Sequence, residues 1–288
     1  MGRGKSAASR ELIAACYDIL AEIQPASVRA VCYRLFVAGL LKNMSKNETN
    51  RVSTQLVWAR KNGNIPDAWI VDETESIERP ASWDHPAEYA DAIEQSYRKN
   101  FWATQRTLVE VWSEKGTVRG TLAPVLDRYG VAFRVFGGFA SYTVVKGVAR
   151  ASKLSTQPLE VLYVGDHDPS GMYMSEEDLP ARLEEYRAER LLLRRVALTT
   201  ADRDSGDLVP FSADTKTADT RHRWYVRRYG TRCAELDAMN PTVLRERVEA
   251  AIVAHIDGHA WARAKQTEEL ERASLFEVVG QWRLSLGA

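Results

Sequence analysis

The chain has 288 residues, of which 45% are hydrophobic and 27% charged, and its 39 basic and 39 acidic residues give a formal net charge of zero. This length suffices for one large domain or two ordinary ones. Three scattered cysteines exclude a disulfide framework and a cysteine metal cluster, and no apolar run is long enough to cross a bilayer. We therefore expect a cytoplasmic protein without a membrane partner, associated with the nucleoid if it is bacterial.

The charge is unevenly distributed along the chain. Residues 1–65 carry ten Lys or Arg and four Asp or Glu, a net charge of +6 (10 − 4), so the remainder carries −6. A basic beginning ahead of an acidic body fits a DNA-contacting module joined to a metal-holding one. An ordinary solvated surface could give the same totals.

Three short helices are predicted at the start of the chain, over residues 9–22, 28–40 and 46–61, with an extended segment at 65–71. Ser27 is a candidate N-cap of the second helix. This order is the outline of a winged helix-turn-helix (CAP-like) domain, which we assign to residues 1–75.

In winged helix-turn-helix domains the third helix enters the major groove. Gln and Arg can read base edges there, while Lys mostly contacts phosphate. The candidate DNA-binding residues of this helix are Arg51, Gln55, Arg60 and Lys61. A polar helix of this kind could also be plain surface.

The second helix carries a tyrosine away from its apolar stripe. At 100° per residue, Tyr33 lies roughly 130° from the centre of that stripe, and Arg29 precedes it by one turn. We expect Tyr33 to project outward beside a cation, which suits a phenolic nucleophile because the cation stabilises phenolate. The alternative is a tyrosine that rests on the neighbouring domain or on a phosphate.

Residues 76–104 are interpreted as a linker followed by a helix, and residues 105–288 as an α/β domain with C-terminal helices. From residue 107 onward, strands at 107–114, 131–136, 159–164 and 195–199 alternate with helices, which implies a parallel sheet with covering helices. The glycines Gly137 and Gly138 could offer backbone amides to a phosphate, although a tight turn would also explain them. Residues 202–207 are expected to be a polar loop.

Two predicted strands end in carboxylates. Glu114 follows the first strand, and Asp166 and Asp168 follow the strand at 159–164, with a turn expected at Pro169 to Gly171. Ligands bind beyond the carboxyl ends of such strands. Carboxylates with no obvious Lys or Arg beside them repel each other, and a divalent cation such as Mg²⁺ or Mn²⁺ would relieve that repulsion. A solvated Asp-x-Asp turn is the alternative.

A strand ending in Glu, followed some fifty residues later by one ending in Asp-x-Asp, resembles the Toprim domain. The motif Gly-Asp-His-Asp-Pro-Ser-Gly at residues 165–171 is similar to the corresponding motif of type IIB topoisomerase A subunits and of the related meiotic double-strand-break transesterase. The segment around Tyr33 resembles their tyrosine motif, although Cys32 stands where a second aromatic is common. The short chain resembles the reduced, stand-alone "mini-A" type.

That resemblance implies that Glu114, Asp166 and Asp168 hold Mg²⁺ or Mn²⁺, that Tyr33 attacks a DNA phosphorus, and that Arg29 offsets developing charge. It also implies a homodimer on double-stranded DNA, with a possible separate ATPase subunit, since no nucleotide-binding Gly-rich loop is evident here. The roles of His167 and Asp237 stay open. A metal-dependent nuclease that uses water, or a non-catalytic DNA-binding protein, are the alternatives.

A second basic cluster, over residues 216–232, is interleaved with aromatic residues. Basic and aromatic residues together suggest a groove that follows a nucleic-acid backbone, and we include Arg221 and Arg223 among the DNA-binding candidates. A helix face paired with the acidic body would account equally well for this pattern.

Overall fold

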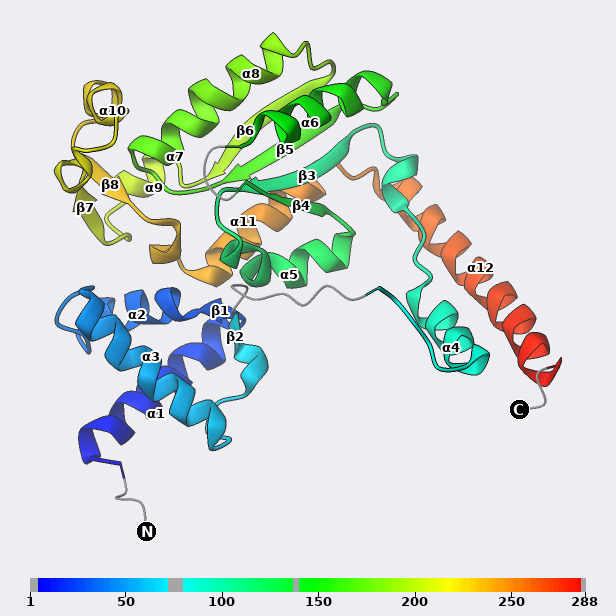
Figure 1. Ribbon diagram of the computed structural model, residues 1–288, viewed down its shortest axis with the longest axis horizontal. Coiled ribbons are helices and arrows are strands. Elements are labelled where there is room, and N and C mark those ends of the chain that lie inside the picture. The colour runs from blue at the N-terminus through cyan, green and yellow to red at the C-terminus, as the bar shows by residue number, and fades with distance from the viewer. Residues whose placement is uncertain (1–4, 72–79, 137–139, 286–288) are drawn as a thin grey trace.

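The protein is a mixed α/β structure in which a helical N-terminal unit lies against a unit built on a parallel sheet (Figure 1). The computed structural model describes residues 5–71, 80–136 and 140–285. The predicted class, α/β plus an α-rich part, is confirmed at this level. Within the described ranges, no helix is both long and apolar enough to span a membrane.

Three helices form the N-terminal unit: α1 (Ala7–Ile23), α2 (Val28–Val37) and α3 (Lys46–Lys61). The predicted bounds of the third helix are confirmed. The second ends earlier than expected because the chain turns at Gly39, whose φ is +73°. Only β2 (Ile70–Val71) of the expected extended segment is a strand, pairing in parallel with β1 (Ala26–Ser27).

One apolar cluster fills the space between these three helices. Its fully buried members include Cys16, Leu20, Val31, Leu35, Val52 and Leu56. The apolar stripe predicted for α2 therefore faces the other two helices, with Val31 and Leu35 fully buried. The face of α2 opposite this stripe is left to contact the rest of the chain.

The central sheet has four parallel strands in the order β4-β3-β5-β6. They are β3 (Leu108–Ser113), β4 (Ala132–Val135), β5 (Leu159–Val164) and β6 (Leu191–Ala197). Side chains of β5 alternate between two cores: Leu162 and Val164 belong to one, Val161 and Tyr163 to the other. The central strands are thus buried on both faces, as the apolar runs in the sequence predict.

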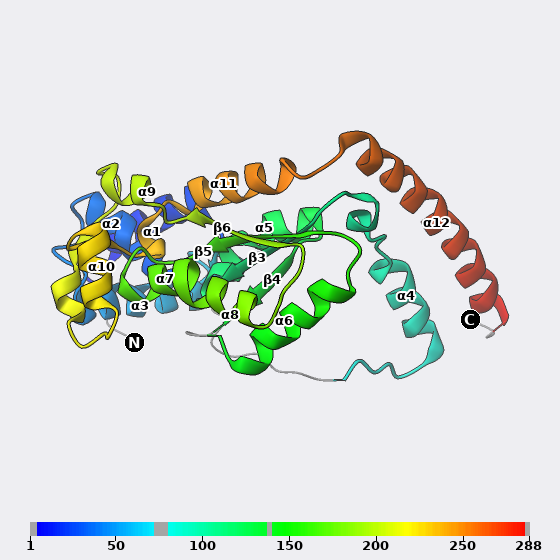
Figure 2. The same ribbon diagram turned by 90° about the horizontal axis from the view of Figure 1, so that it is seen from above.

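Helices cover both faces of the sheet, as Figures 1 and 2 show. The helices α5 (Thr117–Tyr129) and α11 (Pro241–Val253) contribute to the core on one face. The helices α6 (Tyr142–Leu154) and α8 (Leu179–Glu185) contribute to the core on the other. The two glycines proposed to bind phosphate, Gly137 and Gly138, lie outside the described residues.

The segment after β5 differs from the prediction. Pro169 to Gly171 does not form a loop turn but begins α7 (Pro169–Tyr173), which continues through a π-helical turn, η3 (Met174–Asp178), into α8. Proline suits the first helical position because its missing N–H would be unpaired there. This helical segment ends at Glu185, and β6 starts at Leu191 and not at residue 195 as predicted.

The loop expected at residues 202–207 is only partly observed, since its first three residues belong to α9 (Thr200–Asp204). Thr199 and Asp202 form a reciprocal capping box that begins this helix. A short antiparallel pair follows, made of β7 (Pro210–Ser212) and β8 (Arg232–Ala234). Between its strands lie η4 (Ala213–Lys216) and α10 (His222–Tyr229), and after it comes η5 (Leu236–Ala238).

The last helix, α12 (Gly258–Ser285), lies beside α4 (Pro86–Ser96), and the pair extends away from the sheet (Figures 1 and 2). Before β3, the short helix η2 (Phe101–Thr104) contributes the buried Trp102. The ion pair between Lys99 and Glu271, 2.7 Å long, joins the segment after α4 to α12. The predicted linker region thus includes a helix that packs on the C-terminal one.

Candidate active site

Two neighbouring strands bring the predicted carboxylates to one edge of the sheet. β3 and β5 pair in parallel with Ser113 opposite Val164, the last residue of each strand. Glu114 comes next after Ser113, and Asp166 comes two residues after Val164. The parallel register therefore brings Glu114 and Asp166, 52 positions apart in the chain, to the same edge of the sheet, as the sequence predicts.

Glu114 interacts electrostatically with both aspartates. Burial, followed by the charges of Asp166 and Asp168, raises the pKa of Glu114 to about 7 from an ordinary 4.5. A shift of this size needs the carboxylates to share a poorly hydrated region. The described residues nevertheless contain no group of three His, Cys, Asp or Glu side chains gathered tightly enough to be a ready metal site.

Asp166 is almost fully buried, and one of its carboxylate oxygens accepts two hydrogen bonds. Its Oδ1 accepts a hydrogen bond from the backbone N–H of Leu236 at 2.7 Å and from Lys115 Nζ at 2.8 Å. Burial raises the pKa of Asp166, and the nearby Lys115 opposes that rise. The backbone of η5, far along the chain, thus helps to orient this carboxylate.

Asp168 is the N-cap of α7. Its Oδ1 accepts from the backbone N–H of Gly171 at 2.7 Å, and its Oδ2 is bonded to the ammonium of Lys216. Burial alone would raise the pKa of Asp168, but Lys216 and the Gly171 N–H outweigh burial and lower it. The first turn of α7 therefore binds Oδ1 of Asp168 through the Gly171 N–H, whereas Oδ2 is free to bind a cation, here the Lys216 ammonium.

The expectation that no Lys or Arg accompanies the aspartates is wrong. Lys115 pairs with Asp166, and Lys216 pairs with Asp168. Lys115 follows Glu114 in the sequence, and its side chain reaches Asp166 in the loop after the neighbouring strand β5. Lys216 is 48 residues from its partner, so only the fold of the segment after β6 brings the two together.

Arg195 supports the loop between β5 and α7 and was not identified from the sequence. Its Nη1 donates to the carbonyls of Gly165 at 3.0 Å and Asp166 at 3.2 Å, and its Nη2 donates to that of Gly171 at 2.6 Å. Removal from solvent lowers the pKa of this guanidinium. A charged residue inside a strand of a two-faced sheet is the signal that could have revealed it.

The segment 235–238 joins the site to the N-terminal unit. Asp237 accepts from Lys115 Nζ at 3.2 Å through Oδ2 and from Ser27 Oγ at 2.9 Å through Oδ1. Glu235 binds the guanidinium of Arg29 through two bonds of 2.5 and 2.6 Å. Asp237, whose role was open, therefore connects Lys115 with the start of α2.

Tyr33 does not project outward. Its side chain is 4% exposed and belongs to the core cluster of the sheet unit, together with Val118 and Leu236. The reason is tertiary, because α5 and η5 cover the face of α2 opposite its own stripe. Burial raises the pKa of Tyr33 to about 12, although the Arg29 guanidinium lies 5.7 Å from the ring centre.

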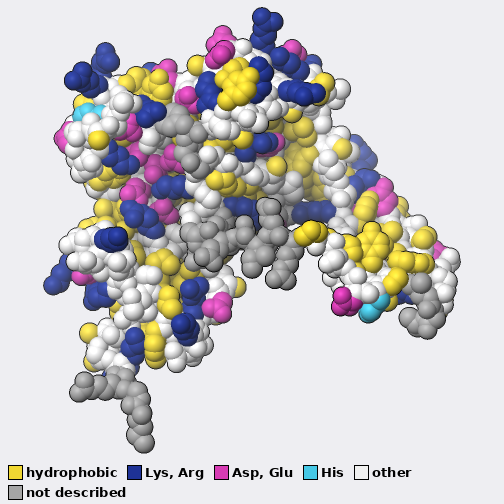
Figure 3. Space-filling model, in the orientation of Figure 1, with side chains coloured by type: hydrophobic (Ala, Val, Ile, Leu, Met, Phe, Trp, Pro, Cys, Tyr) yellow, Lys and Arg dark blue, Asp and Glu magenta, His cyan; other side chains and the backbone are white. Residues whose placement is uncertain are grey.

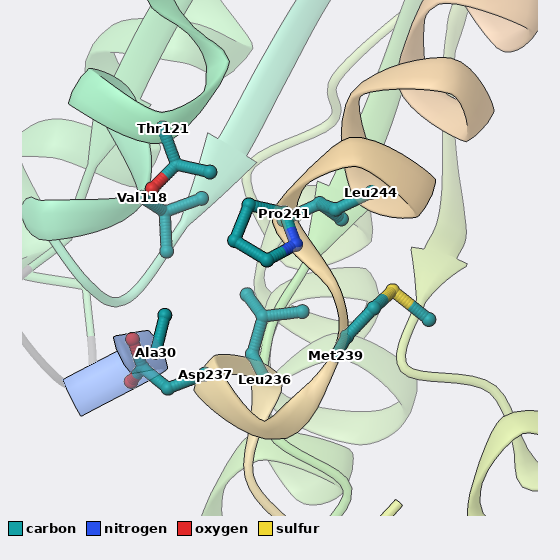
Figure 4. A pocket seen from close by; sticks show the side chains of 8 residues that line it. All are labelled: Ala30, Val118, Thr121, Leu236, Asp237, Met239, Pro241 and Leu244. Atoms are coloured by element: carbon teal, nitrogen blue, oxygen red, sulfur yellow. The ribbon is translucent and has the colours of Figure 1, made fainter. Parts of the chain in front are cut away.

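A small apolar pocket lies at this junction, between α2, α5 and the segment leading into α11 (Figure 4). Its lining includes Ala30, Val118, Leu236 and Leu244, and Asp237 stands at one side. Its free volume of about 20 Å³ holds no more than a water molecule. This pocket is a packing defect between the two units, too small for a substrate.

His167, between the two aspartates, is fully buried and packs within the fold. Its Nδ1 lies 2.7 Å from the hydroxyl of Tyr225, and its Nε2 lies 3.3 Å from that of Thr200. Burial, with nearby Arg203 and Arg195, lowers the pKa of His167 to about 4. At neutral pH the ring is uncharged, so the observed contacts support a packing role.

The four DNA-binding candidates of the third helix all lie on α3. Arg51 pairs with Glu48 at 2.9 Å, Gln55 accepts from Lys5 at 2.7 Å, and Arg60 lies 4.0 Å from Asp67. Lys61 is exposed. In the part of the chain that the structure describes, no hydrogen bond or ion pair links α3 to the carboxylates.

The second basic cluster surrounds α10, next to Lys216. Arg223 is exposed, and Arg221 lies 3.5 Å from Asp219 and 5.9 Å from the ring centre of Tyr173. Trp224 packs edge-on against Tyr173, with ring centres 5.2 Å apart. Figure 3 shows acidic side chains gathered with Lys and Arg where the two units meet.

Comparison of the sequence with known protein families and with characterised proteins finds no match in either set.

Proposed function

We propose that the protein is a DNA-binding protein that cleaves DNA strands with the help of Mg²⁺ or Mn²⁺. Glu114, Asp166 and Asp168 would hold the cation. The observation that carries this proposal is the parallel pairing of β3 and β5, which brings all three carboxylates to one edge of the sheet. The pKa of Glu114, raised to about 7 by burial and by both aspartates, agrees with their closeness. The charges of Asp166 and Asp168 disfavour the ionised form of Glu114, and a divalent cation bound between the carboxylates would remove that repulsion.

The donor set fits such an ion, because all of its ligands are carboxylate oxygens. Lys115 and Lys216 now take up oxygens of Asp166 and Asp168, so the cation must displace or shift their ammonium groups. When bound, it would polarise a phosphate and stabilise the negative charge that develops during cleavage. Arg195 would keep the loop that carries both aspartates in place.

The winged-helix and Toprim descriptions belong to the same proposal, with the division into residues 1–75, 76–104 and 105–288. The four parallel strands, the carboxylates at their ends and the three helices before them support it. The candidates on α3 and α10 would contact double-stranded DNA.

Water is the attacking group that the arrangement favours. Tyr33 is 4% exposed and its pKa is raised to about 12, so its phenolate is scarce at neutral pH. Arg29, the cation expected to assist it, is engaged by Glu235 at 2.5 Å. Hydrolysis needs only the carboxylates and a cation.

Transesterification by Tyr33 is the second candidate, supported by the Arg29 guanidinium 5.7 Å from its ring centre. For this route α2 would have to come away from η5. The type IIB resemblance would then imply a homodimer, in which the tyrosine of one copy serves the carboxylates of the other, and a possible separate ATPase subunit.

Incubation with supercoiled plasmid and Mg²⁺, analysed with and without protease before electrophoresis, tests both candidates. Cleavage that Glu114→Gln abolishes and Tyr33→Phe retains, with free DNA ends, supports hydrolysis. Protein-linked ends that disappear in Tyr33→Phe support transesterification. Plasmid that remains intact together with the absence of Mg²⁺ binding in a titration would leave a non-catalytic DNA-binding protein.

A further inference from the structure

Lys216 reaches a buried carboxylate from the surface. It is the last residue of η4, its side chain is 37% exposed, and its ammonium is bonded to Asp168, whose side chain is 2% exposed. The ammonium lies 5.2 Å from the centre of the Phe211 ring. The Lys216 ammonium is therefore bonded to Oδ2 of Asp168, a proposed cation ligand, while the Lys216 side chain stays accessible to solvent.

Lys115 and Lys216 differ in whether they keep an acidic partner after a divalent cation binds to Asp166 and Asp168. Lys115 also lies 3.2 Å from Asp237, so it keeps an acidic partner. Lys216 has no second carboxylate within ion-pair distance among the described residues. A divalent cation and an ammonium group repel each other at one carboxylate, so Lys216 would be the lysine released.

The surroundings of Lys216 favour an anion as its next partner. η4 contacts α10, which carries the exposed Arg223, Arg227 and Arg228. Of these, only Arg228 has acidic partners among the described residues, Glu177 at 3.4 Å and Glu176 at 3.7 Å. An excess of positive charge beside a site for phosphodiester cleavage attracts the nucleic-acid backbone.

We propose that Lys216 is a substrate-binding residue, which contacts a backbone phosphate of the nucleic acid after a divalent cation replaces it on Asp168. This inference depends on the proposed function, because it requires Asp168 to be a cation ligand. It predicts effects of opposite sign: in the free protein Lys216 competes with the cation, and in the loaded protein it supports the nucleic acid. A purely structural lysine would not produce that pair of effects.

The test compares wild type with Lys216→Met in two binding measurements. Mn²⁺ affinity is measured by electron paramagnetic resonance without DNA, and we expect the variant to bind Mn²⁺ about 3- to 10-fold more tightly because one competing positive charge is gone. Affinity for a labelled DNA duplex is measured by fluorescence anisotropy. With Mn²⁺ present it should fall about tenfold, with the slope of log affinity against log salt smaller by about 0.9.

Two further variants serve as controls. Lys265→Met removes an exposed charge on α12 and should alter neither Mn²⁺ nor DNA affinity. Lys216→Arg keeps the positive charge and should retain most of the DNA affinity. Circular dichroism of each variant checks that it is folded.

The outcomes separate this inference from the proposed function. If the wild-type protein does not bind Mn²⁺, the proposed function is wrong, and the inference about Lys216, which depends on it, is wrong as well. If wild type binds Mn²⁺ but Lys216→Met binds it equally or more weakly, the proposed function stands and the inference is overturned. Loss of DNA affinity that is the same with and without Mn²⁺ also overturns it.

Discussion

The guanidinium of Arg29 and the carboxylate of Glu235 form two hydrogen bonds, 2.5 and 2.6 Å long, between α2 and the segment after β8. Arg34 adds a bond of 2.6 Å to the carbonyl of Ala238. The sequence separations exceed 200 residues, so these contacts fix the N-terminal unit against the edge of the sheet where the carboxylates lie.

Replacement of Arg29 by Met should lower the free energy of unfolding by about 0.5–1 kcal/mol, a modest loss because its side chain is 45% exposed. A double-mutant cycle with Glu235→Gln, followed by urea unfolding, measures the coupling. Arg51→Met, which breaks the 2.9 Å pair with Glu48 inside α3, is the matched control and should cost less. A coupling energy of zero between Arg29 and Glu235 would contradict this account.

Glu114→Gln should stabilise the metal-free protein at neutral pH. The folded pKa of Glu114, about 7, lies above its ordinary value of 4.5. Between these values the folded state holds the proton more tightly, so this group's contribution to stability decreases as pH rises from 4.5 to 7. The total decrease is about 1–3 kcal/mol after allowance for partial exposure.

Urea unfolding in the presence of a chelator, at about pH 5 and about pH 8, measures this difference. We expect the wild type to lose stability relative to Glu114→Gln as pH rises. His167, with its pKa lowered to about 4, has the opposite effect below its ordinary 6.5 and is shared by both proteins, so it cancels in the comparison. A difference between the two proteins that does not change with pH would disprove the assignment.

Gly171→Ala should destabilise the protein by about 2 kcal/mol or more, the range for overpacking in a tight site. An added Cβ would lie 2.5 Å from the carbonyl oxygen of Asp166 and 3.2 Å from Oδ1 of Asp168. Thermal unfolding measures the loss, and Mn²⁺ affinity should fall with it because both aspartates must shift.

Gly147→Ala is the matched control for that substitution. Gly147 lies inside α6, and a Cβ there would meet nothing within 4 Å. Alanine has the higher helix propensity, so this variant should gain about 0.5–1 kcal/mol. An equal response of the two glycines would show that the loop between β5 and α7 is not as closely packed as described.

Arg195→Met should destabilise the protein by about 2–4 kcal/mol, because it removes the charged donor that the carbonyls of Gly165, Asp166 and Gly171 share. Arg194→Met is the control from the neighbouring position, whose guanidinium pairs with Glu160 at 3.0 Å and is 48% exposed. Its cost should stay below about 1 kcal/mol. Urea unfolding measures the free energy of unfolding of both variants. Similar losses in the two variants would refute the supporting role of Arg195.

Local patterns in the sequence determined much of the fold. The third helix is predicted with its bounds because polar residues and Asn62-Gly63 frame it. β5 is recognisable as an apolar run that ends in Gly165 and Asp166. Parallel alternation then places Glu114 and Asp166 at one edge, since adjacent parallel strands end together.

Only the tertiary structure decided which groups those carboxylates meet. A helical projection gives the direction of Tyr33 relative to the stripe of its own helix, but it cannot show that α5 and η5 cover the opposite face. The pairing of Lys216 with Asp168 likewise depends on how 48 intervening residues fold. Periodicity and capping act over a few residues, whereas burial and ion pairing depend on which distant segments pack together.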